Sequence, residues 1–306
     1  MIGIVYTILG NGIEVHVGTA VYRCSIRGKA RRERGHQMKL CAVGDEVEFT
    51  DAGAGEGIIE SVLPRRSKLS RVDPASPSRE LVIAANLDAL LVVVAARTPE
   101  LDLLTIDKCL VLGASGAVPC ALIVNKMDLA PPGTAERLEP YRKLGMRVFL
   151  TAAAKGDGID DLRNFMKGRT ISLVGPSGVG KSSIVNAIAP GLKVRTGLVS
   201  EAYGTGKHTT TWATVFDLPN GRLVDTPGLE YFTAWGVTPE NLKEHYQEFA
   251  AIGAGCRFRD CQHGAEPQCS VIQAFQEGKI AASRMESYRE IRRLLVERKA
   301  LFDAHA

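Results

Sequence analysis

Short runs of alternating apolar and polar residues fill positions 1–70, and this period-two pattern predicts β-strands. Asn11-Gly12 separates the first two runs, Ile4–Leu9 and Ile13–Val17, and Asn-Gly in this setting predicts a tight hairpin turn. Three more runs follow, at Val21–Ile26, Val43–Phe49 and Gly57–Leu63. Five short strands in so few residues predict a small closed β-barrel of the OB-fold type.

A different pattern begins near residue 80. Leu87–Ala95 is apolar almost throughout, which is typical of a strand buried on both faces. Strands and helices then alternate, with strands expected at Pro119–Val124, Arg147–Leu150 and Thr170–Val174, and helices at Leu103–Leu112, Glu136–Leu144 and Gly158–Met166. This alternation predicts a doubly wound α/β domain. Its end is expected to be an antiparallel pair, formed by Phe216–Leu218 and Arg222–Val224.

The C-terminal part of the chain has a third character, a Cys/His cluster followed by a charged helix at Ala281–Phe302. We therefore expect three domains: an OB-fold barrel at 1–70, an α/β domain at 71–233, and a mostly helical domain at 234–306. The longest apolar run, Leu87–Ala96, is about half of what a membrane span needs, and no secretory signal precedes it. We expect a cytoplasmic protein with no membrane partner.

A phosphate-binding loop is indicated at Gly175–Ser182, where the sequence fits G-x-x-x-x-G-K-[ST] between a predicted strand and a predicted helix. The glycines allow backbone N–H groups to turn inward around phosphate oxygens at a helix N-terminus. Lys181 is expected to reach the β- and γ-phosphates during catalysis, and Ser182 to bind Mg²⁺. The expected phosphate-side ligands are Gly175, Pro176, Ser177, Gly178, Val179, Gly180, Lys181, Ser182 and Ser183.

A base-reading motif, Asn125-Lys126-Met127-Asp128, follows the buried strand at Pro119–Val124. The Asp128 carboxylate can accept two hydrogen bonds from guanine, whereas adenine would leave it unpaired at a cost of several kcal/mol. Asn125 would tie the base to neighbouring loops, and the Lys126 stem would flank the sugar. The loop at Ala152-Ala153 is placed to offer a backbone N–H to guanine, so GTP and GDP are the expected ligands.

The groups that contact the γ-phosphate and its magnesium ion are expected in the segment that runs from the phosphate-binding loop to the motif Asp225-Thr-Pro-Gly228. Asp225 would hold magnesium through water, and the Gly228 N–H would sense the γ-phosphate. Thr210 is expected to complete the magnesium shell, with Thr211 as the alternative. Leu229 cannot orient water, so free-enzyme hydrolysis should be slow. His208 is a candidate for positioning the attacking water; contact with RNA or solvent is an equally open role.

The order of these motifs is permuted. The base-reading residues at 125–128 precede the phosphate-binding loop at 175–182, whereas they usually follow it in GTPases. A circular permutation is tolerated because domain termini commonly lie close together. As a consequence, the segment after Gly228 connects a nucleotide sensor directly to the C-terminal domain. We therefore expect nucleotide state to be passed to that domain.

The Cys/His cluster has the spacing Cys256-x4-Cys261-x-His263-x5-Cys269. Three thiolates and one imidazole complete the tetrahedral shell of a Zn²⁺ ion, and a closed shell indicates a structural rather than a catalytic site. One zinc per chain would stabilise a segment that is too small for a core of its own.

Positive charge gathers at two places, the run Arg27–Gly35 beside the barrel and the C-terminal helix, in a chain of net charge +4. The helix carries Arg284, Arg289, Arg292, Arg293, Arg298 and Lys299. A solvated amphipathic face is the simpler interpretation of the helix alone. Together with an OB-like barrel, the two basic regions favour nucleic acid, and RNA over DNA.

Taken together, the barrel, the N-K-M-D, G-P-S-G-V-G-K-S-S, G-K-H-T-T-T and D-T-P-G motifs, and the C-x4-C-x-H-x5-C spacing resemble the bacterial small-subunit-dependent GTPase family RsgA, also called YjeQ. The resemblance implies GTP hydrolysis stimulated by the 30S ribosomal subunit during its late maturation, with 16S rRNA contacted by the barrel and the zinc domain. We expect a monomer. One departure is visible, because Ala152 stands where family members often have serine. The alternative is a nucleotide-regulated RNA-binding module with little turnover.

Overall fold

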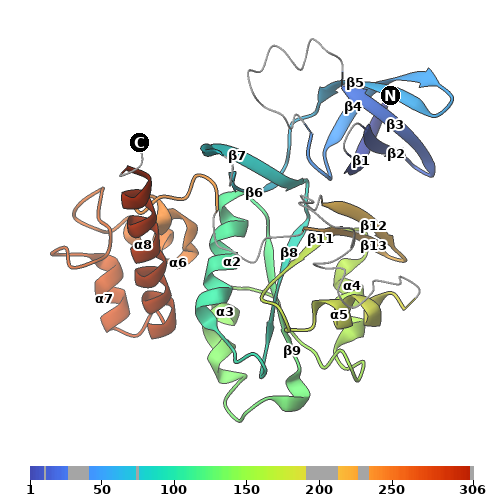
Figure 1. The fold of residues 1–306 in the computed structure, drawn as a ribbon. Coiled ribbons are helices and arrows are strands. Elements are labelled where there is room, and N and C mark those ends of the chain that lie inside the picture. The colour runs from blue at the N-terminus through green and yellow to red at the C-terminus, as the bar shows by residue number, and fades with distance from the viewer. Residues whose placement is uncertain (10–11, 27–40, 74–75, 191–212, 227–233, 304–306) are drawn as a thin grey trace.

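The structure is a computed structural model that describes residues 1–9, 12–26, 41–73, 76–190, 213–226 and 234–303. Figure 1 shows an N-terminal barrel, a central sheet with helices on both faces, and a helical C-terminal region beside helix α2. Of the helices in these ranges, none combines the length and apolarity that a membrane span requires.

The N-terminal barrel is built from five strands, β1 (Ile2–Leu9), β2 (Gly12–Val17), β3 (Ala20–Ile26), β4 (Glu46–Gly53) and β5 (Glu56–Val62). They follow the order β1-β2-β3-β5-β4, and a β1–β4 pairing closes the ring. Only β3 and β5 run parallel among these pairs. Alternate side chains point inward, and the expected OB-like barrel is confirmed. Its interior is Val5, Ile13, Val15, Cys24, Cys41, Val47, Phe49 and Ile59.

A β-hairpin that the sequence pattern did not predict follows the barrel. It consists of β6 (Lys68–Asp73) and β7 (Ser76–Ala85), which pair antiparallel. The hairpin touches the barrel where Val43 bridges Ala84, and it touches the C-terminal region where Arg71 bridges Ala234. The hairpin therefore contacts both flanking regions of the central domain.

The central sheet has the strand order β10-β9-β8-β11-β13-β12, and β12 continues it into β1 of the barrel through an antiparallel pairing. Its strands are β8 (Ala89–Ala95), β9 (Cys120–Asn125), β10 (Val148–Leu150), β11 (Thr170–Val174), β12 (Thr214–Leu218) and β13 (Gly221–Asp225). All run parallel except β12, which is antiparallel to β13 as expected. Every residue of β8 is buried, because helices cover both faces of the sheet.

Helices α2 (Leu103–Ser115) and α3 (Glu139–Lys143) occupy one side of this sheet, and α4 (Ile159–Met166) and α5 (Lys181–Ile188) the other (Figure 1). Short 3₁₀ turns lie at η1 (Met127–Leu129) and η2 (Glu136–Leu138). Alternate residues of β8 enter the two cores: Leu90 packs in the core on the α2 side, and Leu91 in the core on the α4–α5 side. The doubly wound α/β fold is confirmed.

The C-terminal region contains η3 (Leu242–His245), α6 (Gln247–Gly253), α7 (Ser270–Gln276) and α8 (Ala282–Asp303). Its aromatic side chains Tyr246, Phe249 and Tyr288 pack against one another, with ring centroids 4.7–5.3 Å apart. These rings belong to the same core as Ile106 of α2. The C-terminal region therefore lies on the central domain through a shared apolar interior.

Helix α8 does not present the continuous basic face that its sequence suggested. Arg284 is buried between Asp107 of α2 and Glu248 of α6. Two more basic side chains are paired with acids on the surface, Arg293 with Glu290 and Glu297, and Lys299 with Glu240. The simpler amphipathic interpretation fits this helix better, since half of its cations already have carboxylate partners.

Candidate functional site

The motif residues gather at one edge of the central sheet. Asn125 ends β9, residues 151–153 follow β10, the phosphate-binding loop follows β11, and Asp225 ends β13. These four strands are parallel, so their carboxyl ends share one edge. Open α/β sheets bind ligands at this edge.

The phosphate-binding loop requires glycine at two close approaches. At Gly175 an added Cβ would lie 2.0 Å from the Val93 carbonyl oxygen. At Gly180, where φ is +97°, it would lie 2.3 Å from the Asn125 amide nitrogen. Helix α5 begins directly afterwards at Lys181, whose ammonium group donates to the Gly175 and Pro176 carbonyls at 2.6 and 2.9 Å. The loop thus has the tight backbone turn and the positioned cation of a phosphate cradle.

Asn125 joins the two halves of this site. Its side chain is 2% exposed, and its amide group donates to the Val179 carbonyl in the phosphate-binding loop at 2.9 Å. Its Oδ1 atom accepts from the Thr151 hydroxyl and the Ala153 N–H, both at 3.1 Å. One buried amide therefore fixes the base-side loop against the phosphate-side loop. The sequence analysis did not single out the Thr151 hydroxyl, because a threonine that follows a strand gives no distinct signal.

Lys126 also connects the base-side motif to the phosphate-binding loop, but at the surface. Its backbone is left-handed, with φ +59°, and its ammonium group donates to the Gly178 carbonyl at 2.6 Å and to the Thr98 carbonyl. The aliphatic stem therefore lies over the space between the base motif and the phosphate-binding loop. This position suits a side chain that flanks a nucleotide sugar.

The loop after β10 offers a different backbone donor from the ones expected. The Ala152 N–H donates to the Asp157 carbonyl at 3.1 Å, and the Ala153 N–H is used by Asn125. The next N–H group, that of Ala154, has no acceptor among the described residues. Asp128 lies on η1 nearby, with its carboxylate 3.3 Å from the Lys155 ammonium group.

Asp225 has an unusual protonation equilibrium. Burial raises the pKa of its carboxyl group to about 6, although the Lys181 ammonium and the Thr226 N–H oppose the rise. A buried carboxylate with incomplete compensation favours a cation beside it. The residue therefore has the chemistry of a magnesium-site carboxylate, next to the lysine of the phosphate-binding loop.

Several residues from the sequence analysis lie outside the described ranges: Asn11, the basic run Arg27–Gly35, His208, Thr210, Thr211, Gly228 and Leu229. Their assigned roles remain predictions.

The three cysteines and the histidine of the C-terminal region do come together. Their ligand atoms all lie within 4.8 Å of one another. The Cys256 and Cys269 sulfurs are 3.8 Å apart, and His263 Nδ1 is 3.7 Å from Cys256 Sγ and 3.3 Å from Cys269 Sγ. Tetrahedral zinc with Zn–S bonds of ~2.3 Å places its sulfur ligands about 3.8 Å apart. The cluster could therefore hold a metal ion without rearrangement.

The electrostatics of this cluster also suit a metal. Burial lowers the pKa of His263, with help from Lys243, and so favours the neutral imidazole that a metal binds. The pKa of Cys256 lies below its ordinary value; burial opposes this, but N–H groups of Val271 and Ser270 prevail. Burial raises the pKa of Cys261 to about 12, and the neighbouring Cys269 and Cys256 add to the rise. A dication would relieve this crowding of negative charge.

Comparison with known proteins now decides the family. Residues 62–235, more than half of the chain, match the model of the RsgA GTPase family. The chain belongs to the RsgA GTPase family. It is a GTP-hydrolysing enzyme, and the order of its motifs is that of a circularly permuted GTPase.

The alignments with similar proteins cover nearly the whole chain. The small ribosomal subunit biogenesis GTPase RsgA of Moorella thermoacetica is 38% identical, over 88% of this chain and 88% of its own. The protein of that name from Gemmatimonas aurantiaca is 38% identical, over 90% and 91%. The crystal structure of YjeQ from Thermotoga maritima superposes with a TM-score of 0.79 at 34% identity, over 96% of this chain and 98% of that one. That of YloQ, a circularly permuted GTPase, gives 0.76 at 25% identity, over 97% and 95%.

Proposed function

We propose that this protein binds the small (30S) ribosomal subunit and, once bound, hydrolyses GTP to GDP and phosphate during late subunit maturation. The names of its RsgA relatives support the ribosomal partner. The observation that carries the nucleotide assignment is the Asn125 side chain, which ties a guanine-reading motif to a phosphate-binding loop. We further propose a cytoplasmic monomer divided at residues 70 and 233, with 16S rRNA as the bound RNA.

Guanine selection is assigned to Asp128, whose carboxylate would accept from the N1–H and the 2-amino group. The backbone donor to the guanine carbonyl is assigned to the loop at 152–154. Within that loop Ala154 is preferred over Ala152 and Ala153, because its N–H has no protein acceptor among the described residues.

Magnesium is assigned to Ser182, to Thr210 with Thr211 as the alternative, and to Asp225 through water. Bound there with GTP, the ion would neutralise charge on the phosphates during transfer. Lys181 would stabilise the same charge from the loop, and the Gly228 N–H would report the γ-phosphate. His208 or a ribosomal group would position the attacking water, because Leu229 cannot.

One structural zinc is assigned to Cys256, Cys261, His263 and Cys269. Three sulfur ligands and one nitrogen ligand favour zinc over magnesium or calcium, which prefer oxygen. With four protein ligands the metal would have no open position, so its role would be to hold the loop between α6 and α7 against those helices.

The test of the proposed function compares GTPase rates of the full chain alone, with 30S subunits, and with 50S subunits as control. We expect stimulation by 30S subunits only. Phosphate release that stays at background with 30S subunits would instead indicate a nucleotide-regulated RNA-binding module.

A second arm tests the base-reading residue. Asp128→Asn should weaken GTP binding by a factor on the order of 10⁴ and shift preference to xanthosine triphosphate, whose 2-carbonyl group accepts where guanine donates. Asp161→Asn, at an exposed position on α4, is the matched control and should change neither. Equal binding of ATP and GTP by the unchanged protein would contradict the assignment.

A further inference from the structure

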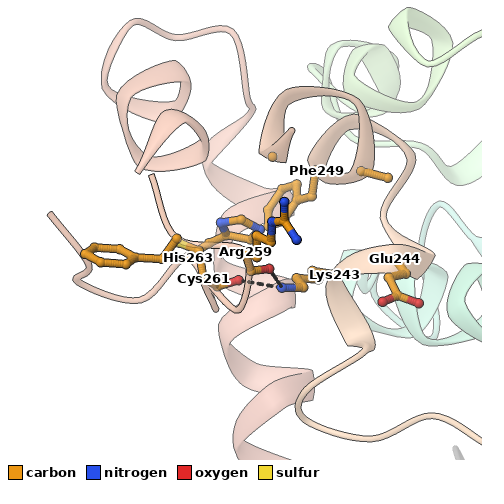
Figure 2. A pocket seen from close by; sticks show the side chains of 9 residues that line it. Lys243, Glu244, Phe249, Arg259, Cys261 and His263 are labelled. Carbon is orange, nitrogen blue, oxygen red and sulfur yellow. Dashed lines mark hydrogen bonds between the residues drawn. The ribbon is translucent and has the colours of Figure 1, made fainter. Parts of the chain in front are cut away.

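A cavity of about 230 Å³ opens beside the metal cluster, away from the nucleotide site. It lies between η3, α6 and the segment that carries Cys261 and His263. Phe249 and Phe258 supply apolar surface to its walls, and Lys243, Glu244 and Arg259 supply charged groups. Figure 2 shows Arg259 beside Phe249, and Glu244 on the opposite side of the view from His263.

One residue of the cavity wall is an exposed aromatic ring. Phe258 is 41% exposed, although a phenylalanine gains free energy from burial. The Arg257 guanidinium carbon lies 5.4 Å from its ring centroid, and the same guanidinium donates to the Gln268 side-chain oxygen at 3.3 Å. The segment therefore presents an aromatic face next to a positioned cation.

The cavity also offers both donors and an acceptor. Lys243 uses its ammonium group to donate to the Arg259 and Cys261 carbonyls at 3.3 and 2.9 Å, and a third N–H remains (Figure 2). The Arg259 guanidinium has no carboxylate partner among the described residues. Glu244 adds one carboxylate acceptor. Two cations, Lys243 and Arg259, against one anion, Glu244, favour a ligand with negative charge outside the cavity and polar edges inside it.

We propose that this cavity receives one unpaired base of single-stranded RNA, with Phe258 as a stacking face and Arg259 and Glu244 at the polar edge of the base. The volume is below the ~300–1,000 Å³ of sites for drug-sized ligands, so it suits a single planar ring system. Unstacked RNA bases bind aromatic rings and arginine planes, and their phosphates bind nearby cations. The proposal rests on the proposed function, which supplies ribosomal RNA as the target.

The test uses the full, metal-loaded chain and a short single-stranded RNA containing 2-aminopurine, whose fluorescence falls when the base stacks on an aromatic ring. Phe258→Leu removes the ring and keeps an apolar side chain. It should abolish the fluorescence decrease and weaken binding of the RNA about tenfold, as expected for the loss of one base–aromatic stack. Phe258→Tyr keeps the ring and should behave as the unchanged protein.

Two comparisons distinguish binding of an RNA base in this cavity from general attraction between cations and phosphates. Phe216→Leu, at a similarly exposed phenylalanine on β12, should leave the RNA binding unchanged. Arg259→Gln should weaken single-stranded RNA more than duplex RNA of equal length at the same salt concentration. Equal losses on both RNAs would overturn the base pocket in favour of phosphate attraction. Displacement of the RNA by an acidic peptide, with no change in fluorescence on RNA binding, would also overturn it in favour of a protein partner.

The outcome is separable from that of the proposed function. If 30S subunits stimulate GTP hydrolysis in the unchanged protein while Phe258→Leu binds RNA and 30S subunits normally, the base pocket is wrong and the proposed function stands. If 30S subunits give no stimulation but the 2-aminopurine signal depends on Phe258, the pocket stands and its ribosomal target is wrong.

Discussion

The two regions that flank the central domain are attached in different ways. The barrel encloses its own core around Val15, Val47 and Phe49. The C-terminal helices have no separate core, since Phe249 and Tyr288 pack in the same cluster as Ile106 of α2. The barrel therefore has an interior of its own and joins the central sheet through the β1–β12 pairing, whereas the C-terminal region and the α2 face of the central domain share one core.

The polar contacts at the two junctions also differ, because the one at the barrel is exposed and those at the C-terminal region are buried. On the barrel side, the Tyr6 hydroxyl donates to Asp217 of β12 at 2.8 Å, at an aspartate that is largely exposed. On the C-terminal side, the Arg284 guanidinium is 5% exposed and binds Asp107 and Glu248. A buried ion pair tolerates much less displacement than an exposed hydrogen bond, because separation leaves charges without solvent.

The largest expected effect is that of removing the proposed zinc from the Cys256, Cys261, His263 and Cys269 cluster. Zinc binding supplies roughly 10 kcal/mol or more to the folding of small metal modules. Chelation should therefore remove hydrogen-exchange protection from α6 and α7, and weaken protection in α2 through the shared core. The barrel strands should be affected least, since most of their buried side chains form a core of their own. Equal loss of protection in the barrel would contradict the difference between the two regions.

Replacement of Arg284 comes next. Arg284→Met leaves Asp107 and Glu248 in the interior without their cation, and breaking a buried pair in this way costs about 3–5 kcal/mol. Urea unfolding, followed by tryptophan fluorescence, should show this loss. Arg293→Met on the same helix is the matched control, because Arg293 binds its glutamates on the surface. Similar unfolding midpoints for the two variants would argue against an energetically important junction.

The pH dependence of the same junction gives a smaller effect with a defined sign. Burial raises the pKa of Asp107 from 3.8 to about 6 against the attraction of Arg284. The folded state then holds this proton more tightly than the unfolded state. The stabilising contribution of the protonated Asp107 to the free energy of unfolding is therefore fully present below about pH 4 and is lost as pH rises through about 6.

Asp107→Asn cannot titrate, so it isolates this contribution. The free energy of unfolding of the unchanged protein minus that of the variant should fall by roughly 2 kcal/mol between pH 4 and pH 7. Measurement of urea midpoints across this range checks the prediction. A difference that increases with pH would mean that attraction to Arg284 outweighs burial.

The alternation of apolar residues was sufficient to predict the barrel and the α/β domain, because nearly all of their strands bury at least one face. It missed the hairpin β6–β7, whose second strand begins with the polar run Ser76-Pro-Ser-Arg-Glu80 and is not apolar until Leu81. Arg284 was also misinterpreted. An arginine on a charged helix looks solvated in the sequence, and its burial depends on Asp107, far away in the chain.

Within the site, local motifs brought the residues together, because four parallel strands end at one edge. Side-chain bonding inside the loops was less predictable. The Ala153 N–H was expected to face a base, but it donates to Asn125 instead. This hydrogen bond forms because two loops approach each other in the fold, and the spacing of residues along the chain does not predict that approach.

The smallest expected effect concerns the barrel junction. Tyr6→Phe removes the hydroxyl that donates to Asp217 but keeps the ring that stacks on His16 at 3.6 Å. Because the aspartate is largely exposed, the loss should be only ~0.5–1.5 kcal/mol. A double-mutant cycle with Asp217→Ala should recover most of this as coupling energy, whereas Tyr22→Phe, a barrel tyrosine packed on Phe49, should show none. Zero coupling between positions 6 and 217 would mean that the β1–β12 pairing and packing hold the barrel without this hydrogen bond, and would increase the difference from the buried ion pairs of Arg284.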